Sequence, residues 1–316
     1  MRIVFMGTSE FALPALRRLI DSKHEVVAVY SQPDRPAGRG RHPTPPPVKA
    51  KAQEWGLPVR QPAKVSTPED TAELAALRPD LIVAAAYGQI LRERVLQLPP
   101  KGTINIHPSL LPRHRGASPV AAAILAGDDE TGATIMLMTL ALDEGPILAQ
   151  RRIPISHQDT TGSLTAQLAA VSADLLIETL HGFLDGAIRP QPQDATAATY
   201  APLVQKEDAL IDWRLPATEI WRRVRAYNPW PGAFTYLDGA PLRILEAWPL
   251  PDDSGEPPGS LGATPPSHEE LLRGTFAVQT GEGLLAALTV QKSGRRALAA
   301  ADFLRGERGL IGRRLG

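Results

Sequence analysis

Cysteine and net charge are what this sequence lacks. The chain of 316 residues contains no cysteine, which excludes disulfide bonds, thiolate metal sites and cysteine nucleophiles. It carries 34 basic and 34 acidic side chains, so no global field draws it toward nucleic acid or an anionic membrane. No apolar run reaches the roughly 18 residues of a membrane span, and the N-terminus lacks a signal-peptide pattern. We therefore expect a cytoplasmic protein without a membrane partner. Any polyanion would have to bind to a local basic patch.

An alternation of apolar runs and helical patterns fills residues 1–188. The composition is globular, with 43% hydrophobic and 22% charged residues, and the length suits two domains. Buried strands are expected at 3–6, 26–30, 81–86, 103–107 and 133–139. Helical patterns occur at 11–20, 68–77, 90–96, 120–125 and 163–183. This order predicts an α/β domain with a doubly wound, Rossmann-like parallel sheet.

A polar, proline-rich stretch separates this domain from the rest of the chain. Residues 189–206 show no periodicity, and we interpret them as an interdomain linker. Beyond it, residues 207–316 contain one helical pattern at 216–227. Short strand patterns follow at 233–237, 242–248, 275–280 and 284–290. The pattern predicts a smaller β-barrel or sandwich, in which residues 251–270 form a loose insertion.

The most informative segment is the strand predicted at residues 103–107. Alternate residues of a strand share a face, so Asn105 and His107 point to the same side. Pro108 cannot donate to a strand ladder, and it therefore ends the strand at the edge where open α/β sheets bind ligands. Asn105 is one of only two asparagines in the chain, the other being Asn228. Two polar side chains thus converge at the predicted ligand edge.

An imidazole beside a carboxamide suits chemistry at the acyl level. The imidazole handles a proton, and the carboxamide donates a hydrogen bond to a developing oxyanion. Asp143 lies in a loop where Gly145-Pro146 allows a tight turn toward the same edge, and its carboxylate could raise the pKa of His107 or accept a proton from an attacking amine. We expect a protonated His107 and Asn105 to stabilise the oxyanion.

Three other interpretations of these residues stay open. His107 could be a structural histidine, as most single histidines are. His107, His114 and Asp143 could bind a metal ion, although their spacing matches no familiar site. A dinucleotide site at Gly7 is not supported, because the second and third glycines of the fingerprint are missing.

The segment from Ile104 to Pro112, followed by Arg115-Gly116 and by Leu142 to Gly145, resembles the folate-dependent formyltransferase family. The resemblance covers essentially the whole chain and implies an OB-like second domain. It implies that the catalytic residues are Asn105, His107 and Asp143, that 10-formyltetrahydrofolate is the co-substrate, and that no metal is needed. The residues implied to contact the folate are Ser109, Leu110, Leu111 and Pro112, together with Tyr87, Gly88, Gln89 and Ile90.

Further segments resemble the members of this family that formylate methionine carried on initiator tRNA. The stretch from Gln32 to Arg41 resembles their insertion loop, which enters the major groove of the tRNA acceptor stem. The resemblance implies that the partner is initiator methionyl-tRNA, with tRNA contacts at Arg35, Arg39, Arg41 and Lys206. We expect a monomer. Two departures are that Arg41-His42 replaces two lysines and that His114 replaces a tryptophan.

Local charge supports an RNA partner independently of the resemblance. Residues 31–51 carry five cations and one anion, a local charge of +4, and residues 289–316 carry a local charge of +5. Both stretches could follow phosphates. The alternative is that these charges are simply solvated, as charge runs commonly are.

Rival functions differ in the features that they require. A formyltransferase acting on an amino sugar nucleotide would resemble both domains but lack the arginine-rich loop at 35–41. A single-domain formyltransferase of purine synthesis would end near residue 189. A non-catalytic module that binds folate or RNA would tolerate alanine at Asn105, His107 and Asp143.

Overall fold

The computed structural model describes residues 1–37, 42–265, 272, 274–307 and 309–316. The chain forms two compact units. The first comprises residues 1–119, 130–154 and 165–202, and the second comprises residues 120–129, 155–164 and 203–316. Every helix within the described residues is too short or too polar to cross a lipid bilayer.

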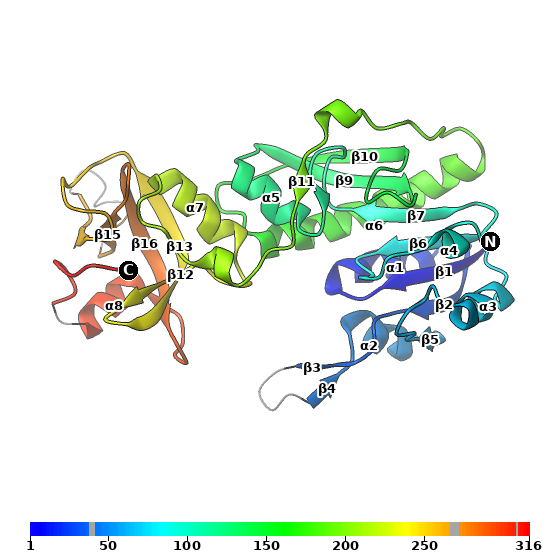
Figure 1. The fold of residues 1–316 in the computed structure, drawn as a ribbon, viewed down its shortest axis with the longest axis horizontal. Helices are drawn as coiled ribbons and strands as arrows, with labels where there is room; N and C mark the ends of the chain where they lie inside the picture. Colours follow the sequence, from blue (N-terminus) through cyan, green and yellow to red (C-terminus); the bar gives the residue numbers. More distant parts are fainter. Residues whose placement is uncertain (38–41, 266–271, 273, 308) are drawn as a thin grey trace. The chain divides into compact units, whose positions relative to one another are not determined.

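A seven-stranded sheet forms the centre of the first unit, in the order β10-β9-β7-β6-β1-β2-β5 (Figure 1). Its strands are β1 (Arg2–Gly7), β2 (Glu25–Tyr30), β5 (Val59–Arg60), β6 (Leu81–Ala85), β7 (Thr103–His107), β9 (Glu130–Leu137) and β10 (Ile147–Pro154). Neighbours from β5 to β7 are parallel, whereas β9 is antiparallel to both β7 and β10. The Rossmann-like prediction is confirmed for the parallel part, and one edge of the sheet is antiparallel.

Helices pack against this sheet because successive side chains of each strand point to opposite faces, and both faces are apolar. The helices of the first unit are α1 (Leu13–Ile20), α2 (Pro47–Glu54), α3 (Pro68–Ala76), α4 (Glu93–Leu96) and most of α6 (Thr161–Leu184), with short 3-10 turns η1 (Glu10–Ala12) and η2 (Ala195–Ala197). Nearly all of α5 (Pro119–Ala126) belongs to the second unit. Val4 and Met6 of β1 join one core cluster with Leu74 of α3 and Val95 of α4. Helices α1 and α2 contact β2 outside that cluster. The carboxyl edge of β6 and β7 is left for loops.

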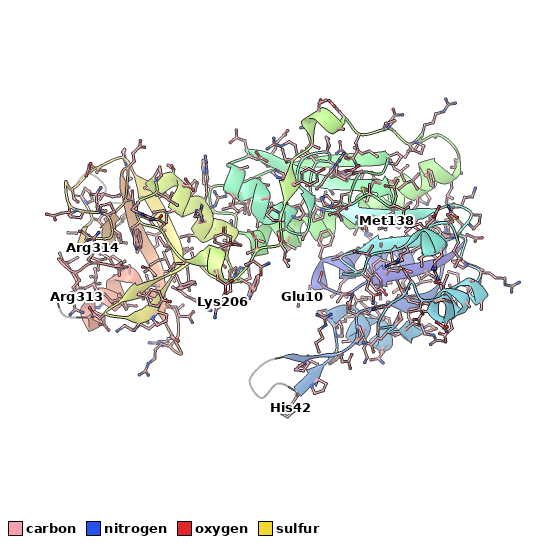
Figure 2. All side chains as sticks on the ribbon, viewed as in Figure 1. Glu10, His42, Met138, Lys206, Arg313 and Arg314 are labelled. Carbon is pink, nitrogen blue, oxygen red and sulfur yellow. The ribbon has the colours of Figure 1, made fainter. Side chains whose placement is uncertain are left out.

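Two short strand pairs extend the first unit. An antiparallel hairpin joins β3 (Arg35–Ala37) to β4 (His42–Thr44), with Arg35 opposite Thr44. Figure 2 shows the His42 side chain on this hairpin. A parallel pair joins β8 (Arg115–Gly116) to β11 (Tyr200–Ala201), and the latter lies in the stretch predicted as a linker. That stretch therefore contains strand pairing with the first unit up to Ala201.

The second unit is a curled antiparallel half-barrel. Its strands follow the order β12-β13-β16-β15-β14, and β17 pairs with β16. The elements are η3 (Glu207–Ala209), α7 (Ala217–Ala226), β12 (Phe234–Leu237), β13 (Ala240–Leu250), β14 (Leu261–Ala263), β15 (Phe276–Gln279), β16 (Leu284–Lys292), β17 (Leu298–Ala299) and α8 (Ala300–Gly306). Ile220 and Val224 of α7 lie four residues apart and pack into one core with Phe276. The predicted barrel class is confirmed.

The insertion expected at residues 251–270 contains part of this barrel. Leu261 of β14 is 3% exposed, and its strand pairs with β15. The expectation of a loose insertion is therefore wrong for β14. This strand has only three residues, and it forms because β15 supplies its hydrogen-bond partners. Residues 266–270 of the same stretch lie outside the described part of the chain.

Candidate active site

Strand β7 carries Asn105 and His107 to the carboxyl edge of the sheet. Asn105 is paired with Ala84 of β6 on one side and Met136 of β9 on the other, and His107 lies opposite Thr134. Asn105 is half-buried, and within the described residues its carboxamide makes no hydrogen bond. This amide is therefore free to donate to a ligand at the sheet edge.

His107 is buried between two oxygen acceptors. Its Nε2 lies 3.0 Å from the backbone oxygen of His114. A carbonyl oxygen only accepts, so Nε2 carries the proton of the neutral imidazole. The Nδ1 atom lies 3.6 Å from Oδ2 of Asp143. The remaining lone pair of the ring thus faces a carboxylate, which stabilises any proton that Nδ1 takes up.

Burial determines the charge of the free imidazole. It lowers the pKa of His107 below its usual value, and the opposing influences of the Asp143 carboxylate and the His114 carbonyl do not cancel this effect. At neutral pH the free enzyme therefore holds a neutral His107. The protonated His107 expected beside the oxyanion would therefore have to gain its proton during the reaction, and that expectation stays a prediction.

The loop between β9 and β10 holds Asp143 in a demanding conformation. Asp143 has a φ of 54°, in the left-handed region that side chains rarely occupy. A Cβ atom on Gly145 would lie only 1.7 Å from the carbonyl oxygen of Leu137, so glycine is required there. The backbone N–H of Gly116 donates to Oδ2 of Asp143 at 2.8 Å. The carboxylate is thus fixed beside His107 by its own loop and by β8.

The segment from Ser109 to Pro112 follows β7 and is held from β9 and β10. The hydroxyl of Thr134 donates to the Ser109 carbonyl at 2.6 Å and accepts from the Leu111 amide at 3.2 Å. The side-chain amide of Gln150 donates to the Leu111 carbonyl at 2.8 Å. Leu110 lies over Gly132, where a Cβ atom would approach Leu110 Cδ2 to 2.6 Å. These contacts fix the shape of the predicted folate segment.

The second predicted folate segment follows β6, the parallel neighbour of β7. The Gln89 carboxamide is fully engaged with the chain, since Oε1 accepts from the Val65 amide at 2.8 Å and Nε2 donates to the Pro62 carbonyl at 2.9 Å. Tyr87 is buried, whereas Ile90 is 85% exposed. Gly88 accepts a hydrogen bond from Gln32 at its carbonyl oxygen. Gln89 shapes this loop, and folate contact by any of these residues stays a prediction.

The predicted tRNA contacts are distributed over both units. Arg35 lies exposed on β3, whereas Arg39 and Arg41 fall outside the described residues. Lys206 is exposed directly before η3 and is labelled in Figure 2. Lys49 forms an ion pair with Asp34 at 2.8 Å, which reduces the free charge near the hairpin. Contact of any of these residues with tRNA stays a prediction.

The basic tail, residues 289–316, is partly neutralised by ion pairs. Lys292 pairs with Glu307, Arg305 with Asp302 and Arg313 with Asp238. Arg295 and Arg296 have no acidic partner among the described residues, and both line a hollow of about 660 Å³ on the second unit. Asp302 and Glu307 line the same hollow, so its charge is mixed, and contact of the two arginines with phosphates stays a prediction.

A metal centre finds no support around His107. In the part of the chain that the structure describes, no three histidine, aspartate or glutamate side chains are grouped as metal ligands. The hydrogen-bond partner of His107 Nε2 is the backbone oxygen of His114 rather than its imidazole. The polar side chains described at this edge are a carboxamide, an imidazole and a carboxylate.

Sequence reasoning missed several groups that build the site. The His114 carbonyl and the Gly116 amide are backbone groups, which no residue-type pattern identifies. Arg115 and Gln193 contact each other and the Asp143 loop through side chains, although 78 residues separate them. Arg115 stands in a motif that the resemblance had singled out, whereas Gln193 stands in a polar stretch without any signal.

Comparison with known proteins identifies relatives of both units. The model of the formyl transferase family matches residues 1–180, and that of its C-terminal domain matches residues 203–308. Methionyl-tRNA formyltransferase of Roseiflexus sp. (strain RS-1) is 52% identical over 318 residues, which cover 100% of this chain and 95% of that protein.

Solved structures share the fold at lower identity. HypX from Aquifex aeolicus in complex with tetrahydrofolic acid gives a TM-score of 0.64 at 20% identity, covering 99% of this chain and 48% of that one. The N-formyltransferase of Helicobacter canadensis in complex with folinic acid and dTDP-3-aminofucose gives 0.66 at 16% identity, covering 92% and 98%.

Proposed function

The chain belongs to the formyl transferase family, and from this premise we propose that it formylates the α-amino group of methionine carried on initiator tRNA. The formyl donor is 10-formyltetrahydrofolate, and the product serves translation initiation in the cytoplasm. The observation that carries the proposal is the site itself: Nδ1 of a neutral His107 lies 3.6 Å from Asp143, on the strand face shared with the unengaged amide of Asn105. This site stands in a chain 52% identical over its whole length to a methionyl-tRNA formyltransferase.

We propose a role for each member of the trio that is consistent with its geometry. The neutral amine of methionine attacks the formyl carbon, and the carbonyl electron pair moves to oxygen. The Asn105 amide donates a hydrogen bond to that oxyanion. Nδ1 of His107 takes the proton from the attacking nitrogen, and Asp143 stabilises the imidazolium. Breaking of the bond between the formyl carbon and the folate nitrogen completes the transfer, with the proton returned to that nitrogen.

Two loops at the carboxyl edge suit the folate co-substrate. The segments Ser109–Pro112 and Tyr87–Ile90 follow adjacent parallel strands, and ligands of open α/β sheets bind at that edge. Hydrogen bonds to Thr134 and Gln150 give the first segment a fixed shape before any ligand arrives. Because this segment is already ordered, binding of a rigid bicyclic ring costs less conformational entropy.

The division of labour that we propose follows the chain. Residues 1–188 carry catalysis, residues 189–206 connect the domains, and residues 207–316 bind tRNA together with the hairpin at 35–44. Charge supports this assignment, since Arg35 and Lys206 are exposed and the hairpin brings further arginines from a chain of zero net charge. We propose that the enzyme acts as a monomer.

The test is a formyl-transfer assay with two acceptors. The protein receives 10-formyltetrahydrofolate and either methionine-charged initiator tRNA or an amino sugar nucleotide, under identical conditions. We expect turnover on the tRNA alone. Turnover on the sugar alone would assign the same chemistry to a different acceptor, and no turnover on either would indicate a binding module.

Arginines of the hairpin loop should act on RNA affinity rather than on chemistry. We expect the double substitution Arg39→Ala and Arg41→Ala to raise the KM for tRNA and to leave kcat nearly unchanged. Loss of two phosphate contacts should lower the slope of log affinity against log salt by about 2. Measurement of the affinity for tRNA at several salt concentrations between about 50 and 200 mM provides that slope.

The matched control for the loop is Arg17→Ala. Arg17 is an exposed arginine on α1 whose guanidinium pairs with Asp21 at 2.8 Å. Arg17→Ala removes one positive charge, against two in the loop variant, and should leave the salt slope unchanged. An equal change in both variants would mean that the loop contributes only general charge.

A further inference from the structure

The stretch at residues 189–202 is bound to the loops of the catalytic site. Gln191 exchanges two backbone hydrogen bonds with Ile147, at 2.7 and 2.8 Å. The Thr199 hydroxyl accepts from the backbone amide of His114 at 2.8 Å. Strand β11 then pairs with β8, which carries the Gly116 amide that binds Asp143. All of these groups belong to the first unit, and the second unit begins again at Leu203.

Gln193 makes the most specific contacts of this stretch. Its Nε2 donates to the backbone oxygens of Asp143 and Gly145, both at 2.8 Å. Its Oε1 accepts from Arg115, at 3.1 Å from Nε and 2.9 Å from Nη2. One carboxamide therefore uses its two N–H groups on the catalytic loop and its oxygen on a buried guanidinium.

Arg115 fixes the direction of that carboxamide. Its side chain is 4% exposed, and Nη1 lies 3.0 Å from Oε1 of Glu144. A guanidinium only donates, so it can face only the oxygen of Gln193, and the amide nitrogen must then face the loop. The Gln193 amide thus has one possible orientation. Glu144 is the residue that follows Asp143, so Arg115 also holds the same loop directly.

The Asp143 loop needs such outside support. Its left-handed φ of 54° is strained for a residue with a side chain, and strained conformations persist only where the surroundings fix them. Gln193 satisfies the two carbonyl groups on either side of Glu144, and Gly116 satisfies the carboxylate. Without Gln193 the loop loses two hydrogen bonds at the place where its backbone is least favourable.

We propose that Gln193, oriented by Arg115, is a positioning residue that holds the Asp143 carboxylate against His107. The inference rests on the proposed function for the roles of these two groups. It makes the segment before the second unit a working part of the catalytic site. A change in the path of that segment would alter the distance between Asp143 and Nδ1 of His107.

The first test reads the imidazole in the free protein and needs no turnover. The groups that face His107 are the Asp143 carboxylate and the carbonyl and ring of His114, with the Arg115–Glu144 pair behind them. NMR titration of isotope-labelled histidine in the full chain follows its protonation. In Gln193→Ala we expect the His107 pKa to move below the wild-type value, in the direction that Asp143→Asn gives and by a smaller amount.

The matched control is Gln191→Ala, in the same segment. Its side chain donates only to the Arg189 carbonyl, and its backbone bonds to Ile147 survive the substitution. This variant should titrate like the wild type. An unchanged His107 titration in Gln193→Ala would overturn the positioning role, whatever its effect on thermal stability.

The second test separates positioning from a general loss of fold. Gln193→Ala should lower kcat by about 10- to 100-fold with little change in the KM for tRNA, because misplacement of a reacting group by about 1 Å has effects of this size. Gln193→Glu keeps the acceptor for Arg115 but loses both N–H donors. We expect the same loss in it, and full activity would show that only the contact with Arg115 matters, which contradicts the proposal.

The two tests also separate this inference from the proposed function. A wild-type protein without formyl transfer to tRNA would refute the proposed function, yet the His107 titration would still report whether Gln193 positions Asp143. An active wild type with an unmoved titration and full kcat in both Gln193 variants would refute the positioning role alone.

Discussion

Asn105→Ala is expected to lower kcat by about 10²- to 10³-fold, the usual effect of removing one donor to an oxyanion. The Asn105 amide has no hydrogen-bond partner within the described residues, so the substitution breaks no structural contact. The side chain is half-buried between Ala84 and Met136, and alanine leaves their backbone ladder intact. Steady-state kinetics with initiator tRNA should show the loss in kcat, with tRNA affinity and melting temperature near the wild-type values.

The chain offers a matched control in its only other asparagine. Asn228 lies in the second unit, and its Nδ2 donates to the Leu245 carbonyl at 3.0 Å. Asn228→Ala removes a structural hydrogen bond, which contributes about 0.5–1.5 kcal/mol, and should lower stability without a comparable loss in kcat. Wild-type kcat in Asn105→Ala, with the protein folded, would remove Asn105 from the chemistry.

Asn105→Asp tests the direction of the hydrogen bond. The carboxylate has nearly the same shape as the amide but cannot donate when ionised, and its charge repels a developing oxyanion. We expect a loss at least as large as in the alanine variant. As the pH falls toward the usual carboxyl range, the activity of Asn105→Asp relative to wild type should rise, because protonation returns a donor while protonation of His107 and the amine lowers the rate of both proteins.

The strands that bear the site were predictable because they are buried on both faces. Continuous apolar runs mark β1 and β6, and a polar residue inside such a run, as at Asn105, is conspicuous. The direction of a strand leaves no comparable trace, which is why the antiparallel placement of β9 was not foreseen. Strand β10 was not predicted because only alternate residues are shielded from solvent, and its run of Gln150, Arg151 and Arg152 is typical of an exposed surface.

The hairpin and α2 show a different limit. Prolines at 43 and 45–47 surround the start of α2, and its sequence has only a narrow apolar face formed by Val48 and Ala52. Propensity therefore gives little indication of a helix, and packing against α1 and β2 determines it. The sequence indicated a basic loop there but not the short strands that support it.

The proximity of Asn105, His107 and Asp143 could be predicted from the sequence, whereas the contacts that hold them in place could not. Alternation placed Asn105 and His107 on one face, and a turn signal placed Asp143 in a loop near them. The contacts of Gln193 with that loop span about 50 residues and arise from tertiary packing, which local patterns do not encode. Desolvation of His107 likewise depends on the whole fold, so the direction of its pKa shift follows only from the structure.

Asp143→Asn should lower kcat/KM by about 10²-fold or more at neutral pH, within the range for loss of a group that supports proton transfer. The amide keeps the shape of the side chain and an acceptor for the Gly116 N–H. It removes the charge that stabilises a proton on Nδ1 of His107. A rate profile from about pH 5 to pH 9 measures the effect at every protonation state.

The pH dependence gives this prediction a definite sign. Burial lowers the pKa of His107 from 6.5, so the wild-type acid limb that reports the neutral imidazole should lie below pH 6.5. The Asp143 charge raises that pKa, so the limb should move to still lower pH in Asp143→Asn. The limb that reports the α-amino group of the substrate belongs to the tRNA and should not move. A limb that shifts to higher pH in Asp143→Asn would contradict the electrostatic role.

Stability should follow the same linkage. The unfolded chain binds a proton at His107 near pH 6.5, whereas the folded chain resists it, so the free energy of unfolding decreases as the pH falls through 6.5 and levels off below the folded pKa. In Asp143→Asn the folded pKa is lower still, so this decrease should continue to more acid pH. Urea titrations between about pH 5 and pH 7.5 measure this decrease in the free energy of unfolding. The control is Asp21→Asn, which removes an exposed carboxylate that pairs with Arg17 on α1. Equal pH dependence in the two variants would mean that the Asp143 charge does not act on His107.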